Sequence, residues 1–328
     1  MRRREFITLL GGAAAGWPLA AAAQQAKQKR RIGVLMSFTE NDPESTIGVS
    51  AFEYGLKKQG WTPGRNVQIE YRWANTLAHY RIFARQLVAL DPDVILAVGG
   101  SSASALQEVT RIIPIVFMEI SDPFFRRLIA SKEQPGGNFT GLIEFEPSIG
   151  KKWLELLKQS APNVTRVAII QNPVVAAWRK LLNTIEKAAS SFNVEVSPVD
   201  VRDALAMERT IANFASSPNG GLIVTPSAFA VIIRERIIAL ATQHKLPAIY
   251  FSPFFVNNGG LISYAPDTSD QYRRAAGYVD RILKGEKPAD MPVQAPTKFD
   301  LVVNLKAAQL IGLTIPADVL TVADHVIK

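Results

Sequence analysis

The sharpest candidate for chemistry in the chain is a turn of two glycines and two serines, Gly99-Gly100-Ser101-Ser102. It follows an apolar run typical of a β-strand and precedes a helical pattern. Glycine lets a ligand approach the backbone, and the first turn of a helix offers unpaired N–H groups and a positive dipole end. The turn therefore predicts a site for a carboxylate or phosphate, contacted by Gly100, Ser101 and Ser102. The alternative is that Ser101 or Ser102 only caps the helix.

Two carboxylates stand just beyond other predicted strands. Asp122, in Ser121-Asp122-Pro123, could accept hydrogen bonds from a ligand ammonium or hydroxyl, although Asp before Pro is also a common way to open a turn. Glu144 follows the predicted strand Phe139–Ile143, at the point where we expect two lobes to meet. Its side chain could contact the ligand or hold the hinge.

Ligands of open parallel α/β sheets bind beyond the carboxyl ends of the strands. Polar and aromatic residues at predicted strand ends are therefore further candidates for ligand contacts: Ser37, Phe38, Ser121, Asn172, Pro226, Ser227, Tyr250 and Phe251. The three aromatic rings could form apolar or stacking walls for a ligand ring, or they could belong to the hydrophobic core.

The residue types that the chain lacks exclude several kinds of site. It has no cysteine and only three histidines among 328 residues, and none of the histidines is within metal-ligand spacing of another. A disulfide framework, a thiol or iron–sulfur site, a zinc site and a histidine-based triad are therefore not expected. We predict neither a metal nor a cofactor. The net charge of +8 is modest, and the one dense basic run, from Lys27 to Arg31, precedes the first strand, so no nucleic-acid partner is predicted.

Residues 1–23 have the features of an export signal that is cleaved. Arg2, Arg3 and Arg4 precede an apolar stretch from Phe6 to Ala23, which ends in small residues. The order of the first residues is similar to that of twin-arginine signals. Gln24 follows the expected cleavage point, where a lipid-anchored protein would have a cysteine. We therefore expect a soluble, unanchored protein in the periplasm.

Short apolar runs alternate with helical patterns, as in βαβ units with parallel sheets. The first series predicts strands at Arg31–Met36, Asn66–Tyr71, Asp93–Val98, Ile113–Met118 and Phe139–Ile143. The second series predicts strands at Arg166–Ile170, Val194–Val199, Gly221–Val224, Ala248–Phe251 and Leu261–Tyr264. Two runs of five units predict two Rossmann-like lobes.

The tail of the chain predicts how these lobes are joined. It contains a helix at Ser269–Lys284, a strand at Asp300–Val303 and a last helix at Leu305–Ile311. We expect the chain to return to the first lobe with the helix and to the second with the strand, which makes three connections and a hinge. The first lobe is then 31–143 plus 265–293, and the second is 144–264 plus 294–328.

Several motifs together resemble the exported substrate-binding proteins of ABC transporters of the tryptophan/tyrosine-uptake type, which have the type I periplasmic-binding-protein fold. The resemblance extends from about Arg31 to Lys328. It rests on Ser121-Asp122-Pro123, Pro135-Gly136-Gly137-Asn138 with Thr140-Gly141, Gly259 to Asp267, Arg273 to Ala276, Leu283 to Gly285 with Pro288 to Asp290, and Pro296 to Phe299 with Asn304 to Lys306.

The resemblance implies a monomeric binder that closes two lobes on a small carboxylate-bearing ligand, an aromatic or branched amino acid or a related acid. It implies delivery to an ABC permease in the inner membrane, with its cytoplasmic ATPase. Two other functions stay open. The same fold serves as a sensory module for a membrane receptor, and a secreted α/β enzyme could use Asp122 and Glu144, although no nucleophile–base pair is evident.

Overall fold

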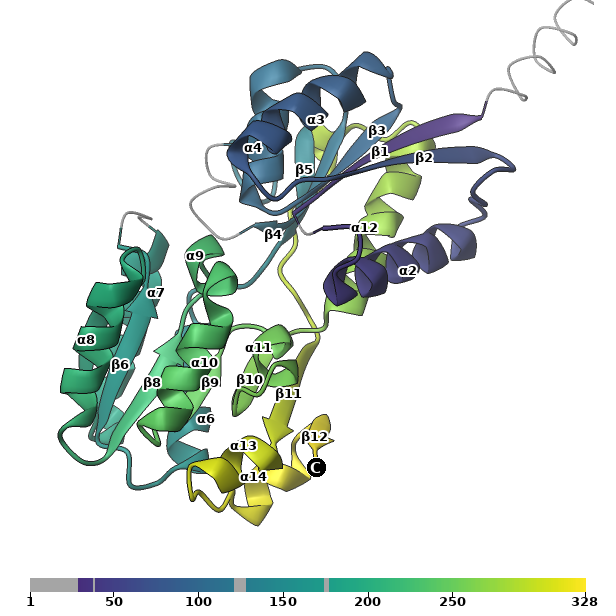
Figure 1. Cartoon of the computed structure of the whole chain (residues 1–328). Helices are drawn as coiled ribbons and strands as arrows, with labels where there is room; N and C mark the ends of the chain where they lie inside the picture. The colour runs from purple at the N-terminus through teal and green to yellow at the C-terminus, as the bar shows by residue number, and fades with distance from the viewer. Residues whose placement is uncertain (1–28, 38, 121–127, 174–176) are drawn as a thin grey trace, which may run out of the picture.

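The computed structural model describes residues 29–37, 39–120, 128–173 and 177–328. Two α/β lobes lie one above the other, and each is built on its own sheet (Figure 1). This confirms the fold class that the alternating pattern predicts. The predicted leader, residues 1–23, lies outside the described residues. No helix in the described part of the chain is long and apolar enough to cross a membrane.

The first sheet has five parallel strands in the order β2-β1-β3-β4-β5. Strands β1, β3, β4 and β5 are mostly apolar and buried, as expected for strands covered on both faces. The edge strand β2 carries polar side chains and is mostly half-buried. Their bounds are β1 Arg30–Met36, β2 Val67–Trp73, β3 Val94–Val98, β4 Ile115–Ile120 and β5 Phe139–Ile143.

Helices cover both faces of this sheet. Helices α2 (Pro43–Lys58) and α12 (Thr268–Leu283) lie side by side on one face, where Phe52 and Tyr272 pack against the sheet. Helices α3 (Leu77–Ala89) and α4 (Gly100–Val109) cover the other face. Because α12 follows ten strands in the chain, the first lobe is completed by a segment from near the C-terminus.

The second sheet has seven strands in the order β12-β11-β10-β9-β8-β6-β7. Five of them repeat the strand order of the first sheet, so the doubled sequence pattern is a doubled topology. Their bounds are β6 Arg166–Gln171, β7 Glu195–Asp200, β8 Gly220–Val224, β9 Ala248–Tyr250, β10 Ile262–Pro266, β11 Phe299–Asn304 and β12 His325–Ile327.

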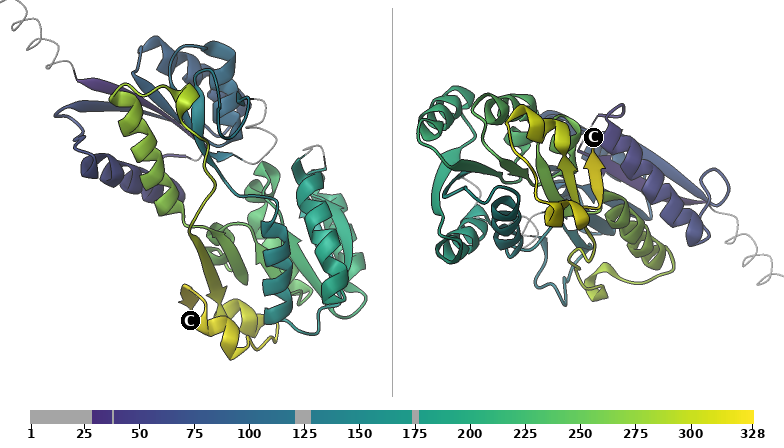
Figure 2. Two further views of the ribbon diagram at one scale, coloured as in Figure 1. Left: turned by 180° about the vertical axis from the view of Figure 1, so that it is seen from behind. Right: turned by 90° about the horizontal axis from the view of Figure 1, so that it is seen from below.

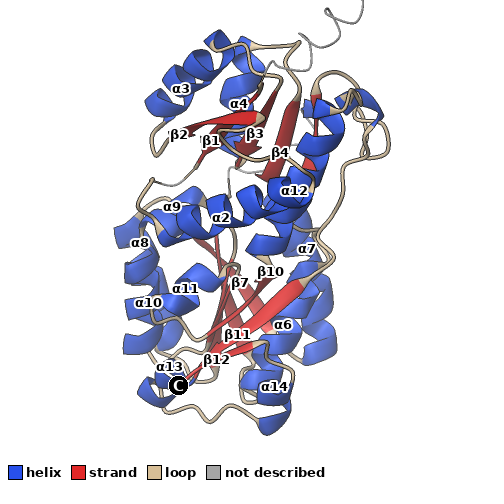
Figure 3. Ribbon diagram, turned by 90° about the vertical axis from the view of Figure 1, so that its right-hand side faces the viewer, coloured by secondary structure: helices blue, strands red, loops and turns tan. Residues whose placement is uncertain are grey.

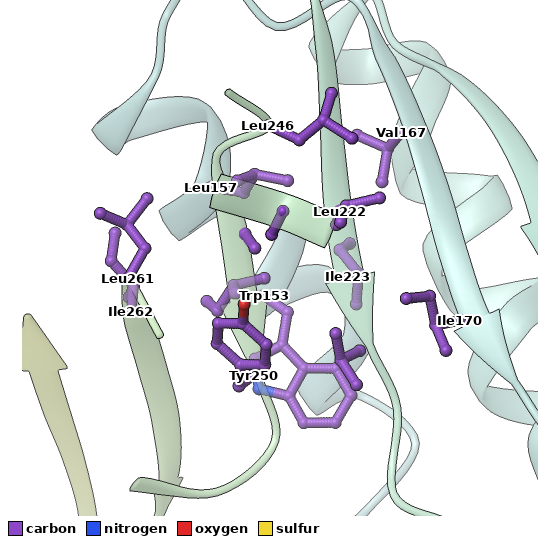
Figure 4. Packing of buried hydrophobic residues seen from close by; sticks show 14 of the residues in the cluster. Trp153, Leu157, Val167, Ile170, Leu222, Ile223, Leu246, Tyr250, Leu261 and Ile262 are labelled. Carbon is purple, nitrogen blue, oxygen red and sulfur yellow. The ribbon is translucent and has the colours of Figure 1, made fainter. Parts of the chain in front are cut away.

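The core of the second lobe is continuous and aliphatic around Trp153 and Tyr250 (Figure 4). Helices α8, α10 and α11 lie on one face of the sheet, and α6 and α7 lie on the other (Figure 1). The helices are α6 Ile149–Ser160, α7 Ala177–Ala189, α8 Ala204–Ala215, α9 Ala228–Ile232, α10 Arg234–Gln243, α11 Pro253–Asn257, α13 Leu305–Leu310 and α14 Ala317–Thr321.

The structure differs from the sequence prediction at three points in this lobe. The helix predicted over residues 228–243 is two helices, α9 and α10, which meet at Ile233. Strand β11 pairs antiparallel with β10, whereas every strand had been expected to be parallel. Helices α11 and α14 and strand β12 are short elements that the pattern does not predict. Elements of three to five residues are too short to show a period.

Three segments connect the lobes (Figures 2 and 3). The chain passes from β5 to α6, back from β10 to α12, and again from the short 3₁₀ helix Pro288–Asp290 to β11. The first and third segments pair where Ile143 N–H donates to the Gln294 carbonyl at 2.9 Å. The second and third are joined by an ion pair of 2.7 Å between Asp267 and Lys298. The connections are therefore tied to one another as well as to the lobes.

Candidate functional site

A cavity of about 150 Å³ lies where the two lobes meet. Both lobes and the connections between them contribute to its walls. Glu44 and Glu119 come from the first lobe, and Phe251 to Phe255 come from the second. The remaining described lining residues are Glu144, Val231, Ala265, Pro266, Thr268 and Gln271.

Glu119 lies on a β-bulge that turns its side chain toward the cavity. The register of β4 against β5 shifts between Phe117 and Ile120, and Glu119 has a φ of 53°. Gly141, opposite, has a φ of 152°, and a Cβ there would clash with the Phe117 backbone. A left-handed conformation costs a non-glycine residue about 1–2 kcal/mol. Bulges and strained residues are common at functional sites, where they change the direction in which a side chain points.

Three carboxyl groups along this wall are protonated more readily than usual. Burial and the nearby Glu44 raise the pKa of Glu119 to about 8. Burial, and then the charge of Glu119, raise the pKa of Glu144 well above its usual value. Burial and Asp42 raise the pKa of Glu44. The side chains keep some accessible surface because they face the cavity, but their burial disfavours the charged forms.

Gln271, in the first turns of α12, contributes an amide with no hydrogen-bond partner. The residue is only 4% exposed, yet neither Nε2 nor Oε1 is paired within the described structure. Asp267 caps this helix by accepting from the Asp270 N–H at 3.0 Å, which fixes the position of Gln271 one turn further on. Buried amides are normally paired, so this one is available to a ligand.

Aromatic rings form the wall on the side of the second lobe. Phe251, Phe254 and Phe255 line the cavity, and Phe251 packs edge-on against Phe255 at 5.2 Å. Tyr250 points away from the cavity. It is 1% exposed, stacks on Phe255 at 5.0 Å and belongs to the core (Figure 4). Side chains alternate along a strand, so adjacent aromatic residues face opposite ways.

The glycine–serine turn is built as a helix start. Gly99 is the N-cap of α4, with a φ of 82° and no side-chain cap, so neither Ser101 nor Ser102 is the N-cap. A Cβ at position 99 would clash with Ser37 Oγ. Ser37 donates to the Val98 carbonyl, and its Oγ is 3.5 Å from that of the fully buried Ser102. Gly100 and Ser101 are half-buried in the first turn of the helix. None of these residues is among those that line the cavity.

The other predicted contacts are distributed as follows. Glu144, expected where the lobes meet, and Phe251, expected at a strand end, both line the cavity. Pro226 is buried and Ser227 is half-buried just after β8, and Ser227 Oγ has no partner within the described structure. Asn172 follows β6 and is half-buried. Phe38, Ser121 and Asp122 lie outside the described residues.

Sequence reasoning did not find Glu44, Glu119 or Gln271. One signal was available for Glu119, because it is the only charged residue in the apolar run Ile115–Ile120, and an ionisable residue in a buried strand marks a functional candidate. No group of three acidic, histidine or cysteine side chains among the described residues could hold a metal ion.

Two α/β lobes, joined by three segments around a polar cavity, define the type I periplasmic-binding-protein class. The chain belongs to the ABC transporter substrate-binding protein family, whose model matches residues 32–327. It is 24% identical over 280 residues to a tyrosine-binding protein of Clostridioides difficile (strain R20291), covering 85% of this chain and 79% of that protein.

Two solved structures have the same fold. A conserved domain protein from Vibrio cholerae is 28% identical and has a TM-score of 0.81, over 91% of this chain and 100% of that one. An ABC domain from Streptococcus pneumonia in complex with L-Trp is 24% identical and also has a TM-score of 0.81, over 92% of this chain and 100% of that one.

Proposed function

We propose that the chain is the solute-binding component of an ABC uptake transporter and closes its lobes on a small aromatic or branched amino acid or a related acid. The observation that carries this proposal is the cavity between the lobes, which has carboxyl groups on one wall and phenylalanine rings on the other. The named ligands of two relatives, tyrosine and L-Trp, support the same class.

The moving bodies in this proposal are residues 31–143 with 265–293, and residues 144–264 with 294–328. A ligand that touches both bodies stabilises the closed arrangement over the open one. Two further contacts for the polar ends of the ligand remain part of the proposal. They are Ser101 and Ser102, in the turn after β3, and Asp122. We infer that no covalent chemistry takes place, since binding alone accounts for the site.

We also propose that residues 1–23 direct export to the periplasm and are then removed, which leaves a soluble monomer with no lipid anchor. The protein would reach an inner-membrane permease, and its cytoplasmic ATPase, by diffusion. The apolar leader and the residue after it, Gln24, support this route. Mass spectrometry of the mature chain should find Gln24 at its N-terminus.

The binding proposal is tested by thermal unfolding of residues 24–328 with single solutes. L-Tyrosine, L-tryptophan, L-phenylalanine, branched-chain amino acids and the corresponding aromatic acids are the test set, with sugars as controls. A ligand at one hundred times its Kd adds about 2.7 kcal/mol of stability. A shift with sugars alone, or turnover of any solute, would contradict the proposal.

A further inference from the structure

The polar groups that line the interlobe cavity have one sign of charge. Glu44, Glu119 and Glu144 are acidic, and none of the described lining residues is basic. The three carboxyl groups come from α2, from the bulge in β4 and from the segment after β5. Three separate parts of the chain therefore bring acceptors to one small space.

Gln271 is an independent sign that a ligand belongs in this space. Its side chain is buried to the same degree as core residues, lines the cavity and has no partner for either amide atom within the described structure. A buried amide left unpaired is disfavoured. A ligand that both donates and accepts hydrogen bonds would satisfy it.

The backbone at Glu119 supports the same interpretation. Its left-handed φ and the register shift beside it are features of β4 that the parallel sheet itself does not need. Their effect is to bring a carboxyl group out of an otherwise apolar strand and into the cavity. This geometry favours a precise contact over a general acidic surface.

We propose that this cavity holds a protonated amine of the ligand, with the ammonium group against Glu119 and Glu144 and the amide of Gln271 bound to the same ligand. The cavity then selects its ligand by the amine and only secondarily by the carboxylate. The inference rests on the proposed function, since it names the chemical group by which the same cavity chooses a solute.

The groups around Glu119 suit a binding step in which a carboxyl group of the cavity releases its proton as the ammonium group of the ligand binds. The groups that face it from neighbouring elements are Glu44 on α2, Glu144 after β5 and Tyr272 on α12, and none of these is a cation. The raised pKa values of Glu119 and Glu144 favour the protonated forms of both carboxyl groups. An ammonium group would release such a proton and form charge-assisted hydrogen bonds.

Isothermal titration of residues 24–328 with three matched compounds tests the inference. For the indole ring these are L-tryptophan, tryptamine and indole-3-propionate, and for the phenol ring L-tyrosine, tyramine and 3-(4-hydroxyphenyl)propionate. We expect the compounds with an amine to bind, and the deaminated acids to bind at least about 30-fold more weakly, as when a buried charge loses its partner. Putrescine is included as an amine without a ring.

Variants locate the effect within the cavity. Glu119→Gln and Glu144→Gln should each remove most of the preference for an amine over the acid. Glu146→Gln is the matched control. Glu146 lies only two residues after Glu144, but it is exposed and pairs with Lys132. It should bind like the unaltered protein.

The outcomes separate this inference from the proposed function. Equal binding of the acids and amino acids would overturn the amine site and leave an aromatic-solute binder. Binding of putrescine but of no aromatic compound would support the amine site and overturn the proposed ligand class. If no compound binds, both are wrong.

Discussion

At the scale of single residues, Glu119 links the function of the protein to its stability. Its pKa in the folded protein, about 8, is above the usual value of 4.5, because burial and Glu44 disfavour the charge. The folded state therefore binds a proton that the unfolded state has already lost at neutral pH. This contribution to stability is complete below pH 4.5 and is lost as the pH rises through 8.

We therefore predict that Glu119→Gln flattens the pH dependence of the unliganded protein. The amide cannot ionise, so the midpoint of thermal unfolding should fall less between pH 5 and pH 9 than in the unaltered chain. At pH 9 the variant should be the more stable of the two, although it binds an amine more weakly. Calorimetric scans at five pH values measure the difference, and parallel curves would show that Glu119 is not buried as described.

Gln271 and Glu119 also show why the site was only partly predictable from the sequence. Strand-end reasoning named Glu144 and Phe251, which line the cavity, because parallel strands must present their carboxyl ends at one edge. A bulge, by contrast, depends on pairing between β4 and β5 and leaves no local pattern. Gln271 lies on a helix from a distant part of the chain, and only the folded topology brings it to the cavity.

At the scale of elements, the pairing of α2 with α12 depends on close approach at glycines. A Cβ on Gly55 would lie 2.7 Å from Ala276 Cβ and 3.1 Å from the backbone of Arg273. Nothing lies within 4 Å of a Cβ built on Gly277, which is also in a helix of this pair. The two positions have the same secondary structure but different room for a side chain.

We predict opposite effects of alanine at these two glycines. Gly55→Ala should destabilise the protein by about 1–3 kcal/mol, because the helices must move apart. Gly277→Ala should stabilise it by about 0.5–1 kcal/mol, because alanine favours the helix. Chemical denaturation measures both changes. A loss of stability at both positions would contradict the prediction, because it would show that Gly277 also lacks room for a methyl group.

The positions of the helices and strands were predictable where burial imposes a regular apolar pattern on the sequence. Strands buried on both faces are continuous apolar runs, so their positions followed from the sequence to within about three residues. The break between α9 and α10 was not visible, because the apolar spacing continues through Ile233. Strand β11 was predicted at Asp300–Val303, but its antiparallel direction was not, since strand direction is set by the connection and not by composition.

At the scale of the whole molecule, three tied connections should allow the lobes to move as rigid bodies. The ion pair between Asp267 and Lys298 and the pairing of Leu142 with Gln294 keep the connecting segments together. Motion is then confined to the few residues between the two sheets, as in hinge closure.

We predict that a saturating ligand reduces the radius of gyration measured by small-angle X-ray scattering. A ligand that contacts Phe251 of the second lobe and Glu119 of the first favours an arrangement in which the lobes are closer together. Glu119→Gln at the same ligand concentration is the control and should stay closer to the unliganded value. An unchanged radius with a bound ligand would show that binding takes place without closure.

The return of α12 to the first lobe also has a consequence for how the chain folds. Trp61 Nε1 donates to Asp280 Oδ1 at 2.8 Å across 219 residues of sequence. A growing chain therefore carries the apolar face of α2 uncovered until most of the second lobe has been synthesised. Contacts between such distant residues slow folding. Both lobes are expected to reach their native packing late and together, in a step that a chaperone could assist by covering Phe52 and Leu56.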